Sequence, residues 1–315
     1  MRLIKKLAYF IPVLIIGCAS PQTTNLTSNA SASPITTNSN PIQNIEKNKV
    51  ANALIWEVQS PNGKNKSYLL ATVHVQLDSR YNLPDKVISA LKSSNKFYME
   101  ADTNVSSLDA TVLSSGFSLD QDLEKDLSPE LWVKLVERLK GFPGMSAQVV
   151  KVLEPWLIKS VLSSLQTPDA TTTDAKKAMD NIVRQKSEDF KIAVNFLETP
   201  KDQIEALKNS KSRDGHIEDI KNILSKNDNA VGEETQAIIT AYNNSDTNAI
   251  LKFDKDRSLS PTEYKTLLTD RENNWYKKLD FANENIFIAV GAMHVIRSNG
   301  IIDTLKSKGF TIRML

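Results

Sequence analysis

The sequence contains one cysteine, Cys18, and only three histidines among its 315 residues. A single cysteine excludes an intramolecular disulfide, and it leaves no cysteine metal site or thiol nucleophile in the rest of the chain. After the first 17 residues no apolar run approaches the length of a transmembrane helix. The chain also lacks a basic block interleaved with aromatic residues, so binding to nucleic acid has no support.

The beginning of the chain predicts a lipoprotein signal peptide over residues 1–17. Arg2, Lys5 and Lys6 form a short basic region, and an apolar stretch follows that is too short to span a bilayer. The stretch ends in an aliphatic residue, Gly17 and Cys18, which resembles a bacterial lipobox. We therefore predict that Cys18 carries acyl chains such as palmitate and anchors the protein to a membrane. The alternative is an ordinary secretory signal with a cysteine at this place by chance.

Residue 19 is Ala rather than Asp, which favours the outer membrane, facing the periplasm, if the host has two membranes. Residues 18–47 are rich in Ser, Thr, Asn and Pro, so we expect a flexible tether that follows the lipidated cysteine. Residues 48–315 are long enough for one domain with a sizeable core. Three positive charges belong to the signal peptide, so the net charge of +2 becomes −1 for the remainder.

Two segments of this domain carry a histidine just after a predicted strand. Residues 66–70 and 285–291 are apolar and rich in residues that favour strands, and they lead to His74 and His294. Each segment continues into a predicted helix and a further strand, which spans residues 96–102 in the first half and 310–315 in the second. We interpret these two strand–His–helix–strand half-units as an internal repeat. The class is therefore α/β.

A mostly helical insertion separates the two half-units. Residues 129–139 form an amphipathic helix, and Pro155 predicts a break in the next one. Residues 192–197 predict a short strand that ends at Glu198, and Thr199 is the expected N-cap of the helix from Pro200. Glu100 and Glu198 thus both follow predicted strands, at the edge of an α/β sheet where ligands bind.

The order of several short motifs resembles the TraB/PrgY/GumN family, which includes the Tiki membrane-tethered metalloproteases and is characterised by two Gly-x-x-His motifs. The resemblance covers the domain from Ala53 to Leu315, and implies a fold like that of EreA, ChaN and Tiki proteins. The motifs are the segments 69–74, 83–84, 99–102, 197–199 with Gln203, Arg271 with Trp275, and 290–294 followed by Gly300 and Gly309.

The resemblance implies metal-dependent hydrolysis, of the kind carried out by peptidases. His74, His294 and Glu100 together would form a two-histidine, one-carboxylate site for a divalent ion (Mn, Co or Zn) with a position open for water. Glu198 or Glu100 would accept the proton of that water, and Arg271 would orient a carboxylate or stabilise an oxyanion. The sequence leaves open which glutamate binds metal and which acts as base.

Two positions depart from the family pattern. The first Gly-x-x-His motif has Ala71 in place of glycine, whereas Gly291 is intact in the second. Family members often have Asn after the arginine of the penultimate helix, where this chain has Glu272.

Two other functional interpretations remain open. In the first, His and Glu act as general base and acid without metal, as in erythromycin-esterase-like enzymes. In the second, the protein is not an enzyme, and it binds a peptide, or haem through a histidine. We interpret His216 as a surface residue, because it lies in a polar segment, and Trp56, Trp132, Trp156 and Trp275 as core residues.

Overall fold

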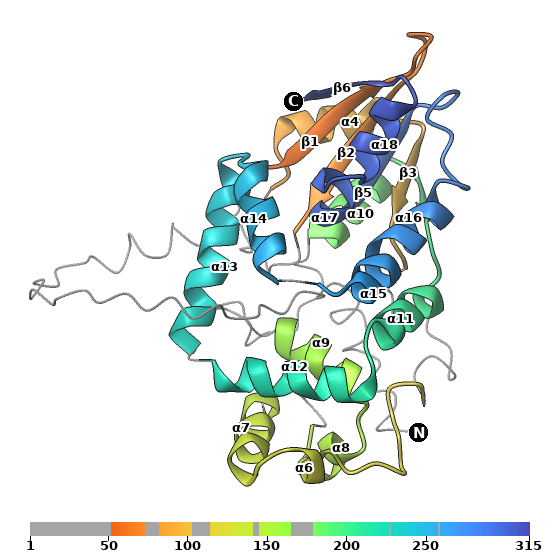
Figure 1. Cartoon of the computed structure of the whole chain (residues 1–315). Helices are drawn as coiled ribbons and strands as arrows, with labels where there is room; N and C mark the ends of the chain where they lie inside the picture. The colour runs from red at the N-terminus through yellow and green to blue at the C-terminus, as the bar shows by residue number, and fades with distance from the viewer. Residues whose placement is uncertain are drawn as a thin grey trace, which may run out of the picture.

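The computed structural model describes residues 52–73, 82–102, 114–140, 145–164, 179–226, 228–257 and 259–315. Figure 1 shows a twisted sheet with helices on both faces and, at the opposite end of the molecule, a separate group of helices. The predicted signal peptide and tether, together with Cys18 and His74, lie outside the described residues.

Six strands form one sheet within the described part of the chain, in the order β4-β3-β5-β2-β1-β6. They are β1 (Leu54–Gln59), β2 (Lys66–Thr72), β3 (Lys96–Met99), β4 (Ala193–Phe196), β5 (Ile286–Gly291) and β6 (Thr311–Met314). Neighbouring strands from β4 to β2 pair in parallel, and β1 pairs antiparallel with both β2 and β6. The α/β class is therefore confirmed.

The helices fall into those that cover the sheet and those that form the group beyond it. Figure 1 shows α4 and α10 behind the sheet and α17 and α18 in front of it. In chain order they are α4 (Asp85–Lys92), α6 (Leu123–Asp126), α7 (Pro129–Leu139), α8 (Ala147–Lys151), α9 (Pro155–Ser164), α10 (Met179–Asp189), α11 (Pro200–Asn209), α12 (Arg213–Ser225), α13 (Asp228–Asn243), α14 (Thr247–Arg257), α15 (Pro261–Tyr264), the π-helix η3 (Lys265–Thr269), α16 (Asp270–Trp275), α17 (Ala292–Ile296) and α18 (Ile301–Ser307).

The strand order does not confirm an internal repeat. From β2 the chain crosses through α4 to β3, which pairs directly with β5. From β5 it crosses through α17 and α18 to β6, which lies one strand further out, beyond β1. The crossover from β2 to β3 passes one strand, whereas the crossover from β5 to β6 passes two, β2 and β1.

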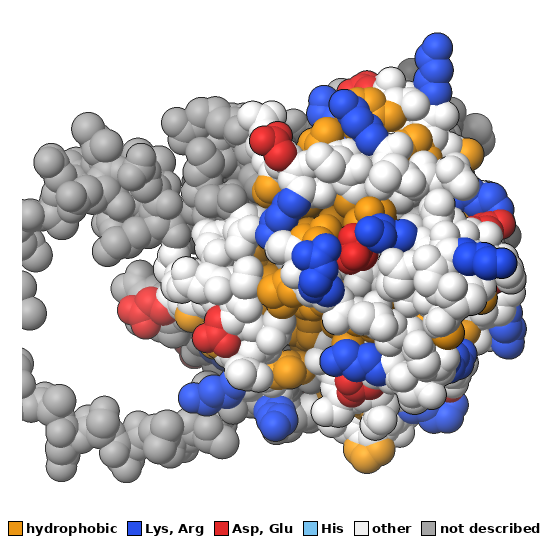
Figure 2. All heavy atoms as spheres, turned by 90° about the horizontal axis from the view of Figure 1, so that it is seen from above, with side chains coloured by type: hydrophobic (Ala, Val, Ile, Leu, Met, Phe, Trp, Pro, Cys, Tyr) orange, Lys and Arg blue, Asp and Glu red, His pale blue; other side chains and the backbone are white. Residues whose placement is uncertain are grey.

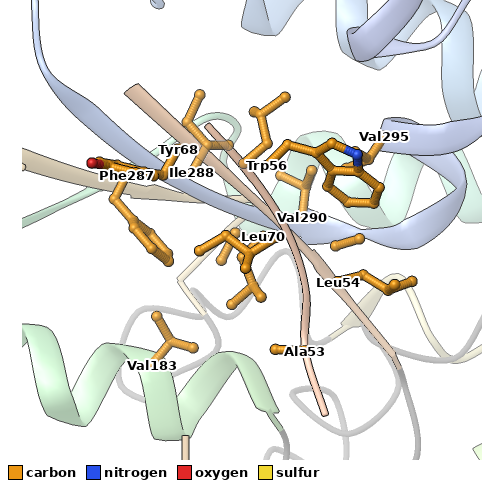
Figure 3. Close-up of a cluster of buried hydrophobic side chains, with 14 of the residues drawn as sticks. Ala53, Leu54, Trp56, Tyr68, Leu70, Val183, Phe287, Ile288, Val290 and Val295 are labelled. Atoms are coloured by element: carbon orange, nitrogen blue, oxygen red, sulfur yellow. The ribbon is translucent and has the colours of Figure 1, made fainter. Parts of the chain in front are cut away.

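The sheet is buried on both faces by apolar side chains. Phe287 and Leu70 lie on the face covered by α10, where Phe287 meets Phe97 of β3 edge-to-face with ring centroids 5.9 Å apart. Figure 3 shows Val183 of α10 on this side of the sheet and Val295 of α17 on the other. This two-sided burial explains why β5 is a continuous apolar run rather than an alternating one.

A second apolar core fills the helical group. Its buried side chains come from α6, α7, α8, α9, α11, α12 and η3, and Leu135, Val150, Ile158 and Ile220 are fully buried among them. Met293 of α17 packs against both cores. The segment from η3 to α16 also joins them, because Leu267 belongs to the helical core and Trp275 to the sheet core. Arg271 of α16 and His294 of α17, two of the candidate site residues, lie along this boundary.

Several local predictions are confirmed. Thr199 and Asp202 form a capping box at the start of α11, and α9 begins at Pro155 after a break. The four tryptophans are buried. The interpretation of His216 as a surface residue is wrong: it lies in the first part of α12, on the buried side of that helix, and is only 3% exposed, with Nε2 3.2 Å from the carbonyl oxygen of Lys208. Burial lowers the pKa of His216 and favours the neutral ring.

The described surface carries mixed charges. Figure 2 shows isolated basic and acidic side chains with hydrophobic ones between them on the face seen from above, rather than one basic patch. In the part of the chain that the structure describes, no helix is long and apolar enough to cross a membrane.

Gly300, at the start of α18, provides a test of packing near α17. A Cβ atom there would lie 2.8 Å from the carbonyl oxygen of His294 and 3.0 Å from that of Arg297. We expect Gly300→Ala to lower the free energy of unfolding by about 1–3 kcal/mol, because backbone cannot move aside as a flexible side chain can. In the control Gly215→Ala the new methyl group meets the flexible side chain of Lys211, and no comparable loss is expected. Urea denaturation measures both; equal stabilities would contradict the packing argument.

Candidate active site

The two candidate glutamates lie side by side at the carboxyl ends of β3 and β4. The parallel ladder between these strands continues for two residues beyond them, since the amide of Glu198 donates to the carbonyl oxygen of Glu100 over 2.9 Å. Both side chains therefore leave the sheet at the same edge, the edge at which ligands gather in open α/β sheets. Their side chains are only 13% and 5% exposed.

Arg271 of α16 joins the two glutamates. Its Nη2 lies 2.6 Å from Oε2 of Glu100 and 2.6 Å from Oε1 of Glu198, while its Nε lies 3.0 Å from Oε2 of Glu198. Its Nη1 lies 3.1 Å from the carbonyl oxygen of Leu267 in η3 and 3.1 Å from Nε2 of His294. A guanidinium has five N–H groups, and these contacts use all of them.

The π-helical turn η3 stands directly before this arginine. Such turns often occur at functional sites because the extra residue redirects the side chains that follow. Burial by itself would lower the pKa of Arg271, but the charges of Glu198 and Glu100 outweigh it and raise that pKa well above its ordinary value. Arg271 is therefore permanently charged and fully engaged, so it has no N–H left for an oxyanion in this arrangement.

Trp275, one turn after Arg271 on α16, closes the other side of Glu198. Its Nε1 donates to Oε2 of Glu198 over 3.0 Å, and the guanidinium of Arg271 lies 4.9 Å from its ring centroid. Its ring also stacks at a tilt on that of His294, with centroids 4.5 Å apart. This fully buried indole donates a hydrogen bond to the Glu198 carboxylate and excludes water from that side.

Glu100 accepts hydrogen bonds from three elements. Its Oε1 accepts from the amide of Gly291 at 2.7 Å, and its Oε2 accepts from Nε2 of Gln203 at 3.1 Å as well as from Arg271. Gly291 ends β5 with φ near −52°, so it needs no left-handed conformation and contributes its amide instead. Ala71 lies in the adjacent β2, in the extended conformation that a strand requires, so its replacement of glycine causes no backbone strain.

His294 lies in α17, just after β5, and is 4% exposed. Its Nδ1 lies 2.9 Å from Oε1 of Glu272, and Oε1 is also 3.3 Å from Nε of Arg297. Arg297 Nη2 donates to the other oxygen of Glu272. Sequence reasoning missed Glu272 and Arg297 as site residues. The available signal was the departure from the family pattern, since Glu272 stands where relatives often have Asn.

Asp180, near the start of α10, is a further carboxyl at this edge that sequence reasoning missed. It is 7% exposed, and within the described part of the chain neither its Oδ2 nor the nearby Oγ1 of Thr72 has a partner of good hydrogen-bond geometry, although the Thr72 hydroxyl lies close enough to lower the pKa of Asp180. Burial, and next the negative charge of Glu100, raise the pKa of Asp180 from about 3.8 to about 7. No motif marks Asp180, because it lies in the helical insertion.

The structure thus brings together Glu100, Glu198, Arg271 and His294, which come from four different elements. The described residues contain no group of three His, Cys, Asp or Glu side chains arranged to hold a metal ion. The donor atoms of Glu100, Glu198 and His294 instead surround the guanidinium of Arg271. With Arg271 in that position the described residues do not fit a divalent ion, which would share the space with a buried positive charge.

The fold and site define an α/β protein whose parallel strands end in a buried carboxylate–arginine–histidine cluster. The profile of the TraB/PrgY/gumN family matches residues 54–314, which is most of the chain. The chain therefore belongs to the TraB/PrgY/gumN family, as its motif order predicts. Searches of curated proteins and of solved structures gave no match.

Replacing Arg271 tests its place at the centre of the site. We expect Arg271→Met to lower the free energy of unfolding by about 3–5 kcal/mol, because Glu100 and Glu198 would remain buried without a counter-charge. Arg271→Lys should recover only part of this, since an ammonium cannot bridge both carboxylates in a planar fork. Arg213→Met, which removes a half-buried pair with Asp126, is the control. Urea denaturation measures these losses. If Arg271→Met lowers the free energy of unfolding by no more than the control does, the assignment is contradicted.

Asp180 predicts a pH dependence of stability with an unusual sign. Between about pH 4 and pH 7 its carboxyl keeps a proton in the folded chain and loses it in the unfolded chain. The folded state then binds more protons, so its stability falls as the pH rises, by up to about 1.4 kcal/mol per pH unit. Asp180→Asn should remove this decline. Urea denaturation at pH 5, 6 and 7 checks it, and parallel pH curves for both proteins would contradict it.

Proposed function

We propose that this protein is a cell-envelope hydrolase of the peptidase type that works by general acid–base chemistry at Glu100 and Asp180. The observation that carries the proposal is the contrast between two carboxyls at one edge of the sheet, one hydrogen-bonded as a carboxylate and the other buried so that the protonated form is favoured. Glu100 accepts hydrogen bonds from Arg271, Gln203 and Gly291, which suit a carboxylate. Burial and the charge of Glu100 raise the pKa of Asp180 to about 7, so a substantial fraction of this carboxyl is protonated near neutral pH. When the environments of two carboxyls move their pKa values apart, the one that stays charged can act as base and the one that stays protonated can act as acid.

Three buried polar atoms support the position of a reacting water or substrate group beside Glu100. Among the described residues, Oγ1 of Thr72, Oδ2 of Asp180 and Oε1 of Gln203 have no partner of good hydrogen-bond geometry, although the Thr72 hydroxyl lies close enough to lower the pKa of Asp180. Buried polar atoms are rarely left unsatisfied, and a bound water or polar ligand is a common explanation. Thr72 lies beside Gly291 in the sheet, and Gly291 and Gln203 both donate to Glu100.

In the proposed reaction Glu100 accepts a proton from the attacking water, and Asp180 donates its proton to the departing amine. The new bond joins the water oxygen to the carbonyl carbon, and the C–N bond breaks. Arg271 and Glu198 hold Glu100 in place rather than contacting the substrate, because every N–H of Arg271 is already used. His294 fixes the remaining side of the guanidinium.

A metal-dependent form of the same hydrolysis is the second candidate, with Mn, Co or Zn as the ion. Its support is that Glu100, Glu198 and Nε2 of His294, the side chains that would supply ligands, all contact the guanidinium of Arg271. In this candidate His74 would supply a further imidazole. It requires Arg271 to leave its described position, so the metal-free form agrees better with the described contacts.

Attachment to the envelope through a lipid on Cys18 is part of the proposal. Its support is the lipobox-like sequence that ends at Cys18 and the polar segment that follows it. A lipid-anchored hydrolase would act on peptides or proteins near the membrane surface.

Incubation of the purified protein with a peptide library, with and without chelator, distinguishes the metal-free from the metal-dependent candidate. We expect cleavage that survives chelation and a metal-free elemental analysis. We expect Glu100→Gln and Asp180→Asn each to lower the rate about 10²–10⁴-fold, whereas Glu137→Gln, at an exposed site in α7, changes nothing. Cys18→Ser protein, released from membranes, serves for these assays. Loss of activity on chelation and stoichiometric metal would favour the second candidate. Absence of cleavage, with a peptide or haem bound instead, would overturn both.

A further inference from the structure

Glu272 is a buried carboxylate between the guanidinium of Arg297 and the ring of His294. It is 2% exposed, and Arg297 binds both of its oxygens, with Nε at 3.3 Å from Oε1 and Nη2 donating to Oε2. His294 Nδ1 lies 2.9 Å from the same Oε1. Removing water from a carboxylate is costly unless it is paired and hydrogen-bonded, and these two partners supply both conditions.

The local backbone explains why Arg297 reaches Glu272. Arg297 is the residue after α17, and the amide of Gly300 donates to its carbonyl oxygen over 2.9 Å, which forms a tight turn. Only a glycine fits at position 300, where a Cβ would lie 2.8 Å from the carbonyl oxygen of His294. Arg297 Nη1 is further held by the hydroxyl of Tyr264, at 3.0 Å. The arginine is therefore fixed against α16 rather than left in solvent.

The contacts on the two sides of His294 require the same tautomer. An ionised carboxylate only accepts hydrogen bonds, so Nδ1 must carry the hydrogen that points to Glu272. A guanidinium only donates, so Nε2 must offer its lone pair to Arg271, at 3.1 Å. The Nδ1–H tautomer satisfies both contacts. The Nε2–H tautomer would place two donors against each other at Arg271 and two acceptors against each other at Glu272.

We propose that Glu272, whose charge Arg297 neutralises, is a positioning residue that fixes His294 as the Nδ1–H tautomer. In this tautomer Nε2 of His294 accepts a hydrogen bond from Arg271 and so holds Arg271 against Glu100. The chain of contacts runs from Arg297 to Glu272, His294, Arg271 and Glu100, so each donor meets an acceptor. Glu272 stands where family members often have Asn, and Arg297 provides the charge that this carboxylate needs. The expected effect on catalysis rests on the proposed hydrolysis, whereas the assignment of the His294 tautomer does not depend on it.

The tautomer can be measured directly, because the chain has only three histidines. In protein with ¹⁵N-labelled histidine, two-bond ¹H–¹⁵N correlation spectra distinguish a protonated from an unprotonated ring nitrogen. His74→Asn and His216→Asn assign the signals by elimination. We expect His294 to show protonated Nδ1 and unprotonated Nε2 at neutral pH. A wild-type His294 protonated at Nε2 alone, or at both nitrogens, would overturn the proposal.

Two double variants isolate the hydrogen bond from the buried charges. Glu272→Gln with Arg297→Met and Glu272→Leu with Arg297→Met both remove the ion pair, but only the first keeps an acceptor for Nδ1–H. Removing both charges avoids leaving either one buried alone. We expect the Gln variant to retain the Nδ1–H tautomer. We expect the Leu variant to lose it, either to the Nε2–H form or to a mixture. An unchanged tautomer in the Leu variant would overturn the role of Glu272.

Kinetics on a cleaved peptide provide the second measurement. Residues that orient a functional histidine typically change activity 10–100-fold when replaced. We expect the Leu variant to lose kcat by about this factor with KM little changed, and the Gln variant to stay close to the wild type. Arg213→Met with Asp126→Leu, in the helical group, is the matched control. If the tautomers behave as expected and no peptide is cleaved, the proposed hydrolysis fails and the positioning role stands. If the Leu variant cleaves the peptide as fast as the wild type, the catalytic part of the positioning proposal is overturned.

Discussion

The contact between Arg271 and the carboxylates of Glu100 and Glu198 is the interaction on which the rest of the site depends. Two carboxylates at adjacent strand ends repel each other in a buried setting, and the guanidinium between them removes that repulsion. The same guanidinium joins the sheet, which supplies the glutamates, to the segment η3–α16, which also belongs to the helical core. Site geometry and the packing of the two cores are therefore coupled.

This arrangement gives a physical meaning to the departures from the family pattern. Ala71 replaces a glycine in a strand that needs no left-handed backbone. Glu272 adds a buried negative charge, which Arg297 neutralises, and it provides the acceptor for Nδ1 of His294. Neither change disturbs the convergence of Glu100, Glu198, Arg271 and His294. The charged residues of the described site alternate in sign along its contacts, which keeps a buried, highly polar cluster satisfied.

Short-range patterns predicted much of the local structure. Apolar runs located β2 and β5, capping residues located the start of α11, and Pro155 located the start of α9. The same patterns failed for His216, since the polar segment around it suggested exposure although the residue lies on the buried side of α12. They also missed Asp180, whose pKa depends on Glu100, which precedes it by 80 positions. Burial and distant charges leave no trace in a short stretch of sequence.

The sequence by itself determined the α/β class, the family, and the strand ends that carry Glu100, Glu198 and His294, because these follow from the local order of apolar residues and motifs. Only the tertiary structure decided the strand order, the central place of Arg271, and the contacts of Glu272 with Arg297 and His294. The reason is that a hydrogen bond or an ion pair depends on distances and directions between elements. Those distances arise when the two cores pack, and no spacing along the chain specifies them.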